Sequence, residues 1–464
     1  MRVRPLRDAI TWSHWYRLAS YARGSLWIVP FFAVATELII SRFIQGLDAR
    51  LGWTLLGLGV SGAQALYGTI ITMTLSFMVF TFGSLLVAIQ VASGQLTPRI
   101  IAATLLRDNT VRYTVGLFVF TLLYTLRAQN RMTDTVLQFT TFTVAFMGLA
   151  SLVMFLYLID YAARLLRPSS IVWRVGESGL AVMRSVYPHE ISQVYRDTPP
   201  LPELGRPNAV IAHGGRSGTL LALNQEALAD LAQESGGIIE FVPHIGDFIA
   251  TDEPLFRLYG TAQTIPPAKL RAAVAVGAER TLEQDPTFAF RILLDIALKA
   301  LSAAINDPTT AVLAIDQIHR LLRTAGRRHL HHEQITDNQG RVLVIVRTPN
   351  WEDYVHLACR EIRLHARENI QIARRLRAMI ENLLSTLPEM RHKALLIELE
   401  LLDRSLVSVY PFPEDLALAR VADAQGMGGV TTAPACVSAD AQNRPVQSDK
   451  LPAGGHTMDE RTLT

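Results

Sequence analysis

Apolar residues in the N-terminal third of the chain form long uncharged runs. From Leu51 through Pro98 there is no Asp, Glu, Lys or Arg, and the part from Tyr67 to Ala92 alone exceeds the ~20 residues that a helix needs to cross a bilayer. A second uncharged run covers residues 136–159 and is followed directly by Asp160. The two runs predict two membrane-spanning helices.

Two further stretches are apolar but carry charges. Residues 24–44 include Glu37, and residues 111–127 are bounded by Arg112 and Arg127. Long arginine side chains at the ends of a helix can extend toward polar surroundings. We therefore expect four spans in all, and Glu37 would be an intramembrane acid that needs a partner, water or a proton.

The residues before the first span have the composition of an interfacial amphipathic helix. Residues 1–23 contain Trp12, Trp15, Tyr16 and five arginines, and they lack the cleavage pattern of a signal peptide. The predicted membrane domain, an interfacial helix followed by four spans, covers residues 1–168.

The arginines predict the orientation of the spans. Four spans with both chain ends in the cytoplasm place eleven arginines inside and four outside, in agreement with the positive-inside rule. The outer group consists of Arg42, Arg50, Arg127 and Arg131, and the inner group of Arg2, Arg4, Arg7, Arg17, Arg23, Arg99, Arg107, Arg112, Arg164, Arg167 and Arg174.

Small and polar residues recur within the second span at steps of three, four or seven residues, so they lie along one stripe of a helix. Such a stripe either packs against another helix or faces water, as in the pore of an oligomer. Both interpretations stay open at this stage. The stripe consists of Thr69, Thr72, Ser76, Gly83, Gln90 and Gly94.

The pattern changes after the last span. Residues 169–207 include a Pro-rich passage and are predicted to be a linker, and residues 208–265 alternate short strand patterns with turn residues. This second segment resembles the barrel-sandwich hybrid of biotinyl and lipoyl carrier modules, and Asn224 is placed to cap a helix within it. No Lys occurs between Asp160 and Lys269, so no lysine there could carry a prosthetic group.

Residues 266–420 are predicted to be mainly helical, and residues 421–464 to be a disordered tail. The fold class expected for the whole chain is therefore an α+β membrane protein: four transmembrane helices, a small β-barrel-like module and a helical region. Asp307, followed by Pro308 and Thr309, is predicted to cap a restarting helix.

Polar residues around this restart define a candidate cytoplasmic site. The carboxylates could converge on a cation or a basic partner, but capping or pairing of each with a nearby Arg explains them as well. The candidates are Asp285, Asp295, Asn306 and Asp307. A second cluster, formed by His329, His331, His332 and Glu333, lacks a distant ligand at matching spacing, so no metal site is expected.

Three separated segments carry a resemblance to a known family. They are "SGQLTPR" at 93–99, "GAERTLEQDPTF" at 277–288 and "DIALKALSAAINDPTTAV" at 295–312. With them the chain resembles a bacterial family of predicted membrane proteins catalogued as domain of unknown function, number two-two-five-four. The resemblance implies a multi-pass protein of the bacterial inner membrane, and it carries no established activity.

Composition narrows the function classes. Mean hydropathy is +0.23, and a net charge of only +3 argues against a nucleic-acid partner. No nucleophile and base, phosphate loop or metal signature is present, so we expect neither an enzyme nor a cofactor. Two classes remain: a homo-oligomeric channel or transporter-like protein in the lipid bilayer, and a membrane-anchored sensor or scaffold whose cytoplasmic domain binds a partner that the sequence does not identify.

Overall fold

The structure is a computed structural model that describes residues 12–429, with gaps at 14, 17, 20–24, 26, 52–55, 96–107, 133–134, 166, 192–203, 331–333 and 338. Part of the expected interfacial helix and residues 430–464 of the expected tail therefore lie outside the described residues. In the described part of the N-terminal segment, Trp12 stacks on Tyr16 and both rings pack against Leu221, Ala222 and Ala275.

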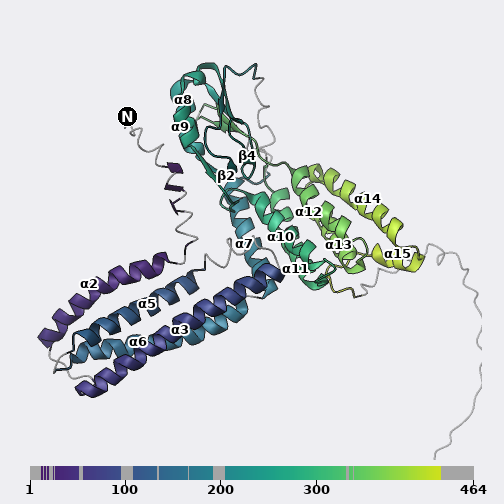
Figure 1. Cartoon of the computed structure of the whole chain (residues 1–464). Helices are drawn as coiled ribbons and strands as arrows, with labels where there is room; N and C mark the ends of the chain where they lie inside the picture. Colours follow the sequence, from purple (N-terminus) through teal and green to yellow (C-terminus); the bar gives the residue numbers. More distant parts are fainter. Residues whose placement is uncertain are drawn as a thin grey trace, which may run out of the picture. The chain divides into compact units, whose positions relative to one another are not determined.

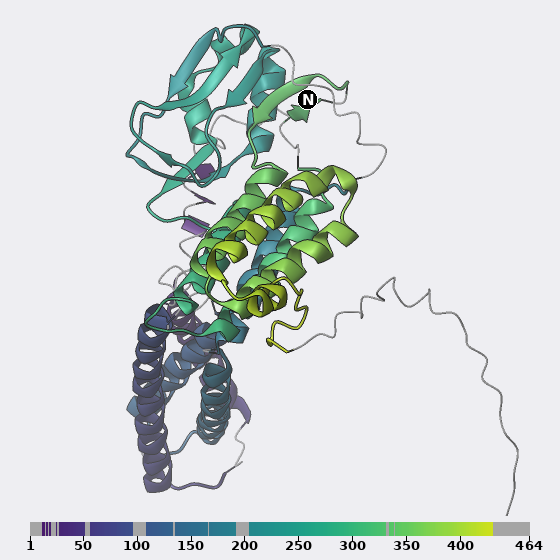
Figure 2. The same cartoon turned by 90° about the vertical axis from the view of Figure 1, so that its right-hand side faces the viewer.

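Four long helices form the N-terminal region, called the four-helix region below (Figure 1). They are α2 (Ile28–Leu51), α3 (Val60–Gln95), α5 (Asn109–Asn130) and α6 (Gln138–Leu165). α5 packs against each of the other three, and Figure 2 shows the helices running lengthwise beside one another. The helices expected over 24–44 and 111–127 are thus present as α2 and α5.

The innermost helix, α5, is also rich in polar residues. Its buried side chains include Thr114, Thr121 and Thr125. The Thr121 hydroxyl lies 3.1 Å from that of Ser151 on α6, and the Thr125 hydroxyl donates to the Thr121 carbonyl. Hydroxyl groups that bond within the protein can be placed in an interior without water.

α2, α3 and α6 present large apolar side chains outward, and two of these helices are candidate membrane spans. Among the described residues, α3 over 60–91 and α6 over 138–164 are long and apolar enough to cross a membrane. Large exposed side chains on α3 include Val79, Leu86 and Val87, each at least 60% exposed. The structure thus supports two candidate spans, and α2 and α5 do not meet the same criteria.

A helix occupies much of the segment expected to be a linker. α7 (Pro168–Val186) begins directly after α6 and buries one face against α10 and α11. A Cβ added at Gly179 would lie 2.7 Å from the Ala289 Cβ and 3.0 Å from a Leu321 methyl carbon. The close approach of the three helices therefore requires glycine at this position.

The β region contains two sheets, and in the described strands neither closes into the expected barrel. One sheet has the order β1 (Ala209–Ala212), β5 (Pro254–Tyr259), β3 (Ile238–Phe241), β8 (Val342–Val346), β7 (Gln334–Thr336); the other has the order β4 (Phe248–Ile249), β2 (Gly218–Leu223), β6 (Val274–Gly277).

The larger sheet also extends beyond the expected module. β8 lies parallel to β3, with Ile239 opposite Val344, so strands from outside 208–265 complete the sheet. Pairing of such distant strands leaves no local sequence signal. Helices α8 (Gln225–Ser235) and α9 (Pro267–Ala272) complete the β region, and the predicted Asn224 cap of α8 is confirmed by its bond to the Ala227 amide.

The remaining helices form the helical region together with α7. They are α10 (Pro286–Ala300), α11 (Pro308–Gly326), α12 (Trp351–His365), α13 (Ile370–Thr386), α14 (His392–Val409) and α15 (Pro413–Ala419). A single apolar core runs through them, with Phe290, Ile315 and Met379 fully buried. The range 266–420, which was expected to be mainly helical, thus contains these helices and also the strands β6, β7 and β8 of the β region.

Residues 421–429, which were expected to belong to the tail, bond to α13. The buried Arg374 guanidinium donates to the carbonyl oxygens of Val421, Gly428 and Gly429. Asp423 accepts from the Gly426 and Gly428 amides. This short segment is ordered because each end of it has a specific hydrogen-bond partner.

Candidate functional site

The candidate stripe on α3 faces away from the rest of the described chain. Thr69, Thr72, Ser76, Gly83 and Gln90 are all exposed, and nothing lies within 4 Å of a Cβ added at Gly83. The structure therefore excludes packing against α2, α5 or α6 as the reason for the stripe. A second copy of the chain, lipid or water is left to cover it.

Hydroxyl groups on this stripe are satisfied within α3. Thr69 donates to the Ala65 carbonyl at 2.8 Å, Thr72 to Gly68 at 2.9 Å and Ser76 to Thr72 at 2.8 Å. Each hydroxyl oxygen keeps lone pairs that point out of the helix. The stripe can thus accept hydrogen bonds or contact a cation without leaving an unpaired donor.

Glu37, which was expected to be an intramembrane acid, has a partner. Glu37 on α2 is 3% exposed, and Arg127 Nη1 lies 3.3 Å from both of its carboxylate oxygens and 2.7 Å from the Ser41 hydroxyl. Arg127, which was expected to extend toward polar surroundings at a helix end, instead turns to a carboxylate 90 residues away. The pair explains how both charges are held between helices that present apolar surfaces.

Asp285 begins α10 and is almost fully buried. One carboxylate oxygen accepts from the Phe288 amide at 3.1 Å, and the other lies 3.2 Å from Arg280 Nε. Burial raises the pKa of this carboxyl, although Thr287 and Arg280 oppose that shift. A Cβ at Gly246 would collide with Arg280 and Asp285, so the turn beside them requires a residue without a side chain.

The other acidic candidates have local partners. Asp295 pairs with Arg291 at 2.7 Å, and Arg291 also reaches Glu361 at 2.6 Å. Asp307 caps α11, as predicted, through the Thr310 amide at 3.0 Å and the Thr310 hydroxyl at 2.5 Å. The carboxylates of Asp295 and Asp307 thus already have partners nearby in the sequence, Arg291 and Thr310.

Asn306 lies in the turn between α10 and α11 and has an unusual backbone conformation. Its φ of +46° lies in the left-handed region, where Asn is tolerated better than most residues. Its amide donates to the Ser302 carbonyl at 2.9 Å. The break between α10 and α11 is therefore a tight turn between two capped helices.

The four cytoplasmic candidates are not brought together. Asp285 and Asn306 lie at opposite ends of α10, whose 15 residues extend about 22 Å. Among the described residues no group of three or more His, Cys, Asp or Glu could hold a metal ion. His331, His332 and Glu333 lie outside the described residues, and the His329 amide bonds to the His189 carbonyl.

A polar cluster that the sequence analysis did not single out joins three helices. Asp108 caps α5 through the Thr110 amide at 2.9 Å. Its second carboxylate oxygen accepts from the Tyr161 hydroxyl at 2.5 Å and from Arg174 Nη1 at 3.1 Å. The Asp-Asn-Thr order before an apolar run was a signal for the cap, but nothing local pointed to α6 and α7.

A cleft of about 420 Å³ lies where the β region meets α7 and α10. Gln284 joins the two regions, because its side-chain oxygen accepts from the Leu223 amide at 2.9 Å. Tyr187 lies in the wall, and burial raises its pKa to about 12. The polar lining has charges of both signs, from Glu226, Asp285 and Arg347; the wall consists of 185–188, 223–226, 284–287 and 346–349 with Trp12 and Ile245.

Taken together, the two candidate spans and the mixed sheet and helix regions indicate a membrane protein of mixed helix and sheet structure. The chain belongs to the family described as predicted membrane protein (DUF2254), whose match extends over residues 23–382. This confirms the resemblance found from the three sequence segments.

The relatives found carry no assigned activity. The uncharacterized protein Rv1290c of Mycobacterium tuberculosis and the uncharacterized protein Mb1321c of Mycobacterium bovis are each 26% identical over 366 residues, which cover 75% of this chain and 69% of the relative. No solved structure matches the chain.

Proposed function

We propose that the protein assembles into a homo-oligomer in which copies of α3 surround a path for ions or small solutes. The observation that carries the proposal is the exposed stripe of small and polar residues on an otherwise apolar helix. α3 has 36 residues and extends about 54 Å, more than the ~30 Å of a bilayer core. The proposed role is conduction rather than catalysis.

The interior of one protomer offers no room for such a path. Aromatic rings from α3, α5 and α6 block a continuous path between these helices: the Phe77 and Phe155 centroids lie 4.0 Å apart, and Phe118 lies 5.8 Å from Phe77. Tyr67 and Tyr124 are each 1% exposed. The outward face of α3, between copies, is the surface that remains.

The spacing along the stripe favours self-association of α3. Thr69, Ser76, Gly83 and Gln90 follow one another at intervals of seven residues, the repeat with which helices wind around each other in a left-handed supercoil. Small side chains let backbones approach. Uncharged hydroxyl and amide groups replace part of an ion's hydration shell without trapping the ion.

We also propose four spans in the bacterial inner membrane, with both chain ends in the cytoplasm. The arginine distribution supports this orientation, and the Glu37–Arg127 pair supports α2 and α5 as neighbouring spans. Reporter fusions at Gly46 and Arg131 should be external, and fusions at Arg107 and Gly260 internal. An external fusion at Gly260 would contradict the topology.

The test of conduction is flux through the purified protein in liposomes, measured across several salts and voltages. Ser76→Leu and Gln90→Leu should each reduce the flux, because an isobutyl group takes the place of a polar group. Phe82→Leu is the matched control, since Phe82 is 44% exposed and lies about 100° around the helix from Gly83. Unchanged flux in both stripe variants would remove α3 from the path.

A membrane-anchored sensor or scaffold is the second candidate. The cleft near Asp285 favours it, because a 420 Å³ cavity with convergent polar groups has the size of a small-molecule site. Absence of flux from correctly inserted parent protein would favour this candidate. Substitutions that fill the cleft, such as Thr287→Phe, should then abolish ligand binding in the cleft, whereas stripe variants should retain it.

A further inference from the structure

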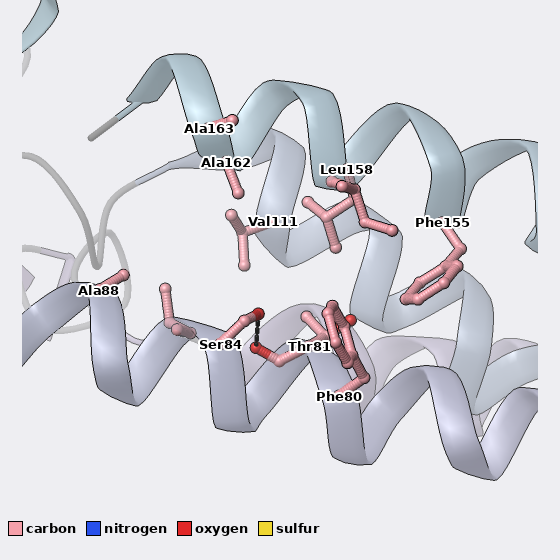
Figure 3. A pocket seen from close by; sticks show the side chains of 11 residues that line it. Phe80, Thr81, Ser84, Ala88, Val111, Phe155, Leu158, Ala162 and Ala163 are labelled. Carbon is pink, nitrogen blue, oxygen red and sulfur yellow. Dashed lines mark hydrogen bonds between the residues drawn. The ribbon is translucent and has the colours of Figure 1, made fainter. Parts of the chain in front are cut away.

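A cavity of about 170 Å³ lies inside the four-helix region, between α3, α5 and α6. Figure 3 shows that Phe80 and Phe155 close one end, whereas Ala88, Ala162 and Ala163 lie toward the other. Apart from two hydroxyl-bearing residues, its lining side chains are hydrocarbon.

The exposure of the lining residues indicates where the cavity opens. Thr81, Val111 and Leu158 at its floor are 5% exposed or less, whereas Phe80 and Ile159 are 53% and 43% exposed. The exposed pair comes from α3 and α6, the two candidate spans. The mouth therefore opens sideways between these helices, toward the surface that lipid would cover.

One buried polar group lines this cavity without a partner. Thr81 is 4% exposed, and its hydroxyl has no hydrogen-bond partner among the described residues. The Ser84 hydroxyl donates to the Thr81 carbonyl at 3.0 Å, not to the Thr81 side chain (Figure 3). Leaving a buried hydroxyl unpaired is costly, and the exposed Thr69 and Thr72 on the same helix avoid that cost by bonding to carbonyl groups.

We propose that this cavity binds a small membrane-dissolved amphiphile, with an apolar body about the size of a benzene ring and one oxygen that hydrogen-bonds to Thr81. An apolar cavity of ~150 Å³ stays dry and holds a benzene-sized molecule, so the volume fits. An acyl chain could occupy the cavity, but it would leave the Thr81 hydroxyl unpaired. It would also gain little free energy by moving there from contact with other lipid chains.

The inference concerns a site within one protomer and is independent of the proposed conducting path. Its test uses the full chain in nanodiscs and two probes that differ by one hydroxyl group, 4-fluorobenzyl alcohol and 4-fluorotoluene, followed by fluorine NMR. Empty nanodiscs correct for partition into lipid. The parent protein should bind the alcohol about three- to tenfold more tightly than the toluene, the worth of one hydrogen bond.

Variants locate the effect. Thr81→Val has nearly the same shape and should reduce the preference for the alcohol to about onefold, whereas Thr81→Ser keeps a hydroxyl and should keep the preference. Thr74→Val is the matched control, because the Thr74 hydroxyl is also buried without a partner among the described residues but does not line the cavity. Ala162→Phe should fill the cavity and abolish binding of both probes.

Four results would overturn the proposal. Equal binding of both probes to the parent would mean an apolar void without selection by Thr81. A preference that survives Thr81→Val would assign the hydrogen bond to another group. Binding of neither probe, or binding that persists in Ala162→Phe, would show that this cavity is not the site.

Discussion

Helices α3 and α10 are both strongly apolar, yet they lie in opposite surroundings. On α3, Val79 and Leu86 are each 67% exposed, whereas on α10 Phe290, Leu293 and Ile296 are fully buried by α7, α11 and α12. In water the exposed face of α3 would be an aggregation surface. The difference shows that an apolar helix can be covered in two ways: α10 is covered by helices of the same chain, whereas the outer face of α3, a candidate span, is left for surroundings outside the described chain.

Polar groups on the two helices follow the same division. The exposed hydroxyls of Thr69 and Ser76 on α3 bond to carbonyls of their own helix, as is required where water is absent. On α10, Arg291 instead reaches Glu361 on α12. The exposed face of α3 makes its hydrogen bonds within the helix, whereas α10 depends on its neighbours, so substitutions should affect the two regions differently.

The largest expected contrast comes from removing one side chain in each helix. Phe290→Ala should lower the free energy of unfolding by about 3–5 kcal/mol, because it opens a cavity in a closed core. Leu86→Ala should change it by less than about 0.5 kcal/mol. Thermal and denaturant unfolding of the purified full chain measure both. A severe loss of stability in Leu86→Ala would show that protein packs against α3, as in the proposed oligomer. If this loss depends on protein concentration, the packing partner is a second copy of the chain.

Ion pairs sharpen the comparison next. Arg127→Leu should cost about 3 kcal/mol, since it leaves the buried Glu37 carboxylate unpaired, and Glu37→Gln combined with Arg127→Leu should recover much of that loss. In the helical region Arg291→Leu should cost about 1 kcal/mol, because its partners Asp295 and Glu361 are 17% and 40% exposed and water solvates them. Equal losses in the two single variants would contradict the burial argument.

Acid should act on the helical region and not on α3, which has no Asp, Glu or His side chain to take up a proton. Burial and then Arg375 lower the pKa of His319 from 6.5 to about 4. Between these pH values the unfolded chain binds a proton that the folded chain does not, so stability present above pH 6.5 falls as the pH decreases toward 4. His319→Gln should flatten the pH dependence by about 1–2 kcal/mol, given the partial exposure of the ring, as measured by denaturant unfolding from pH 7 to 4.

The smallest effect concerns the cap between α10 and α11. Asp307→Ala should cost about 1 kcal/mol and Asp307→Ser should be nearly neutral, because Ser also accepts from the Thr310 amide. Unfolding midpoints of the two variants measure the difference. Severe, equal loss of function in both variants with unchanged stability would instead indicate a binding role for Asp307.

Features that depend on neighbouring residues could be predicted from the sequence. The uncharged runs gave α3 and α6, and the caps at Asn224 and Asp307 followed from residue type and order. The α3 stripe was also visible, because helical spacing alone defines it. The sequence left open whether the stripe packs inside the protomer, since nothing local says which face α5 covers.

Tertiary structure decided which distant groups meet. It paired Glu37 with Arg127 across 90 residues, set β8 beside β3, turned the expected linker into a packed helix, and left Thr81 unpaired beside a cavity. By itself the sequence determined where α8 and α11 begin and where α3 and α6 exclude charge, because capping and hydropathy act within a few residues. Pairing between remote segments depends on shape and burial that exist only once the chain has folded.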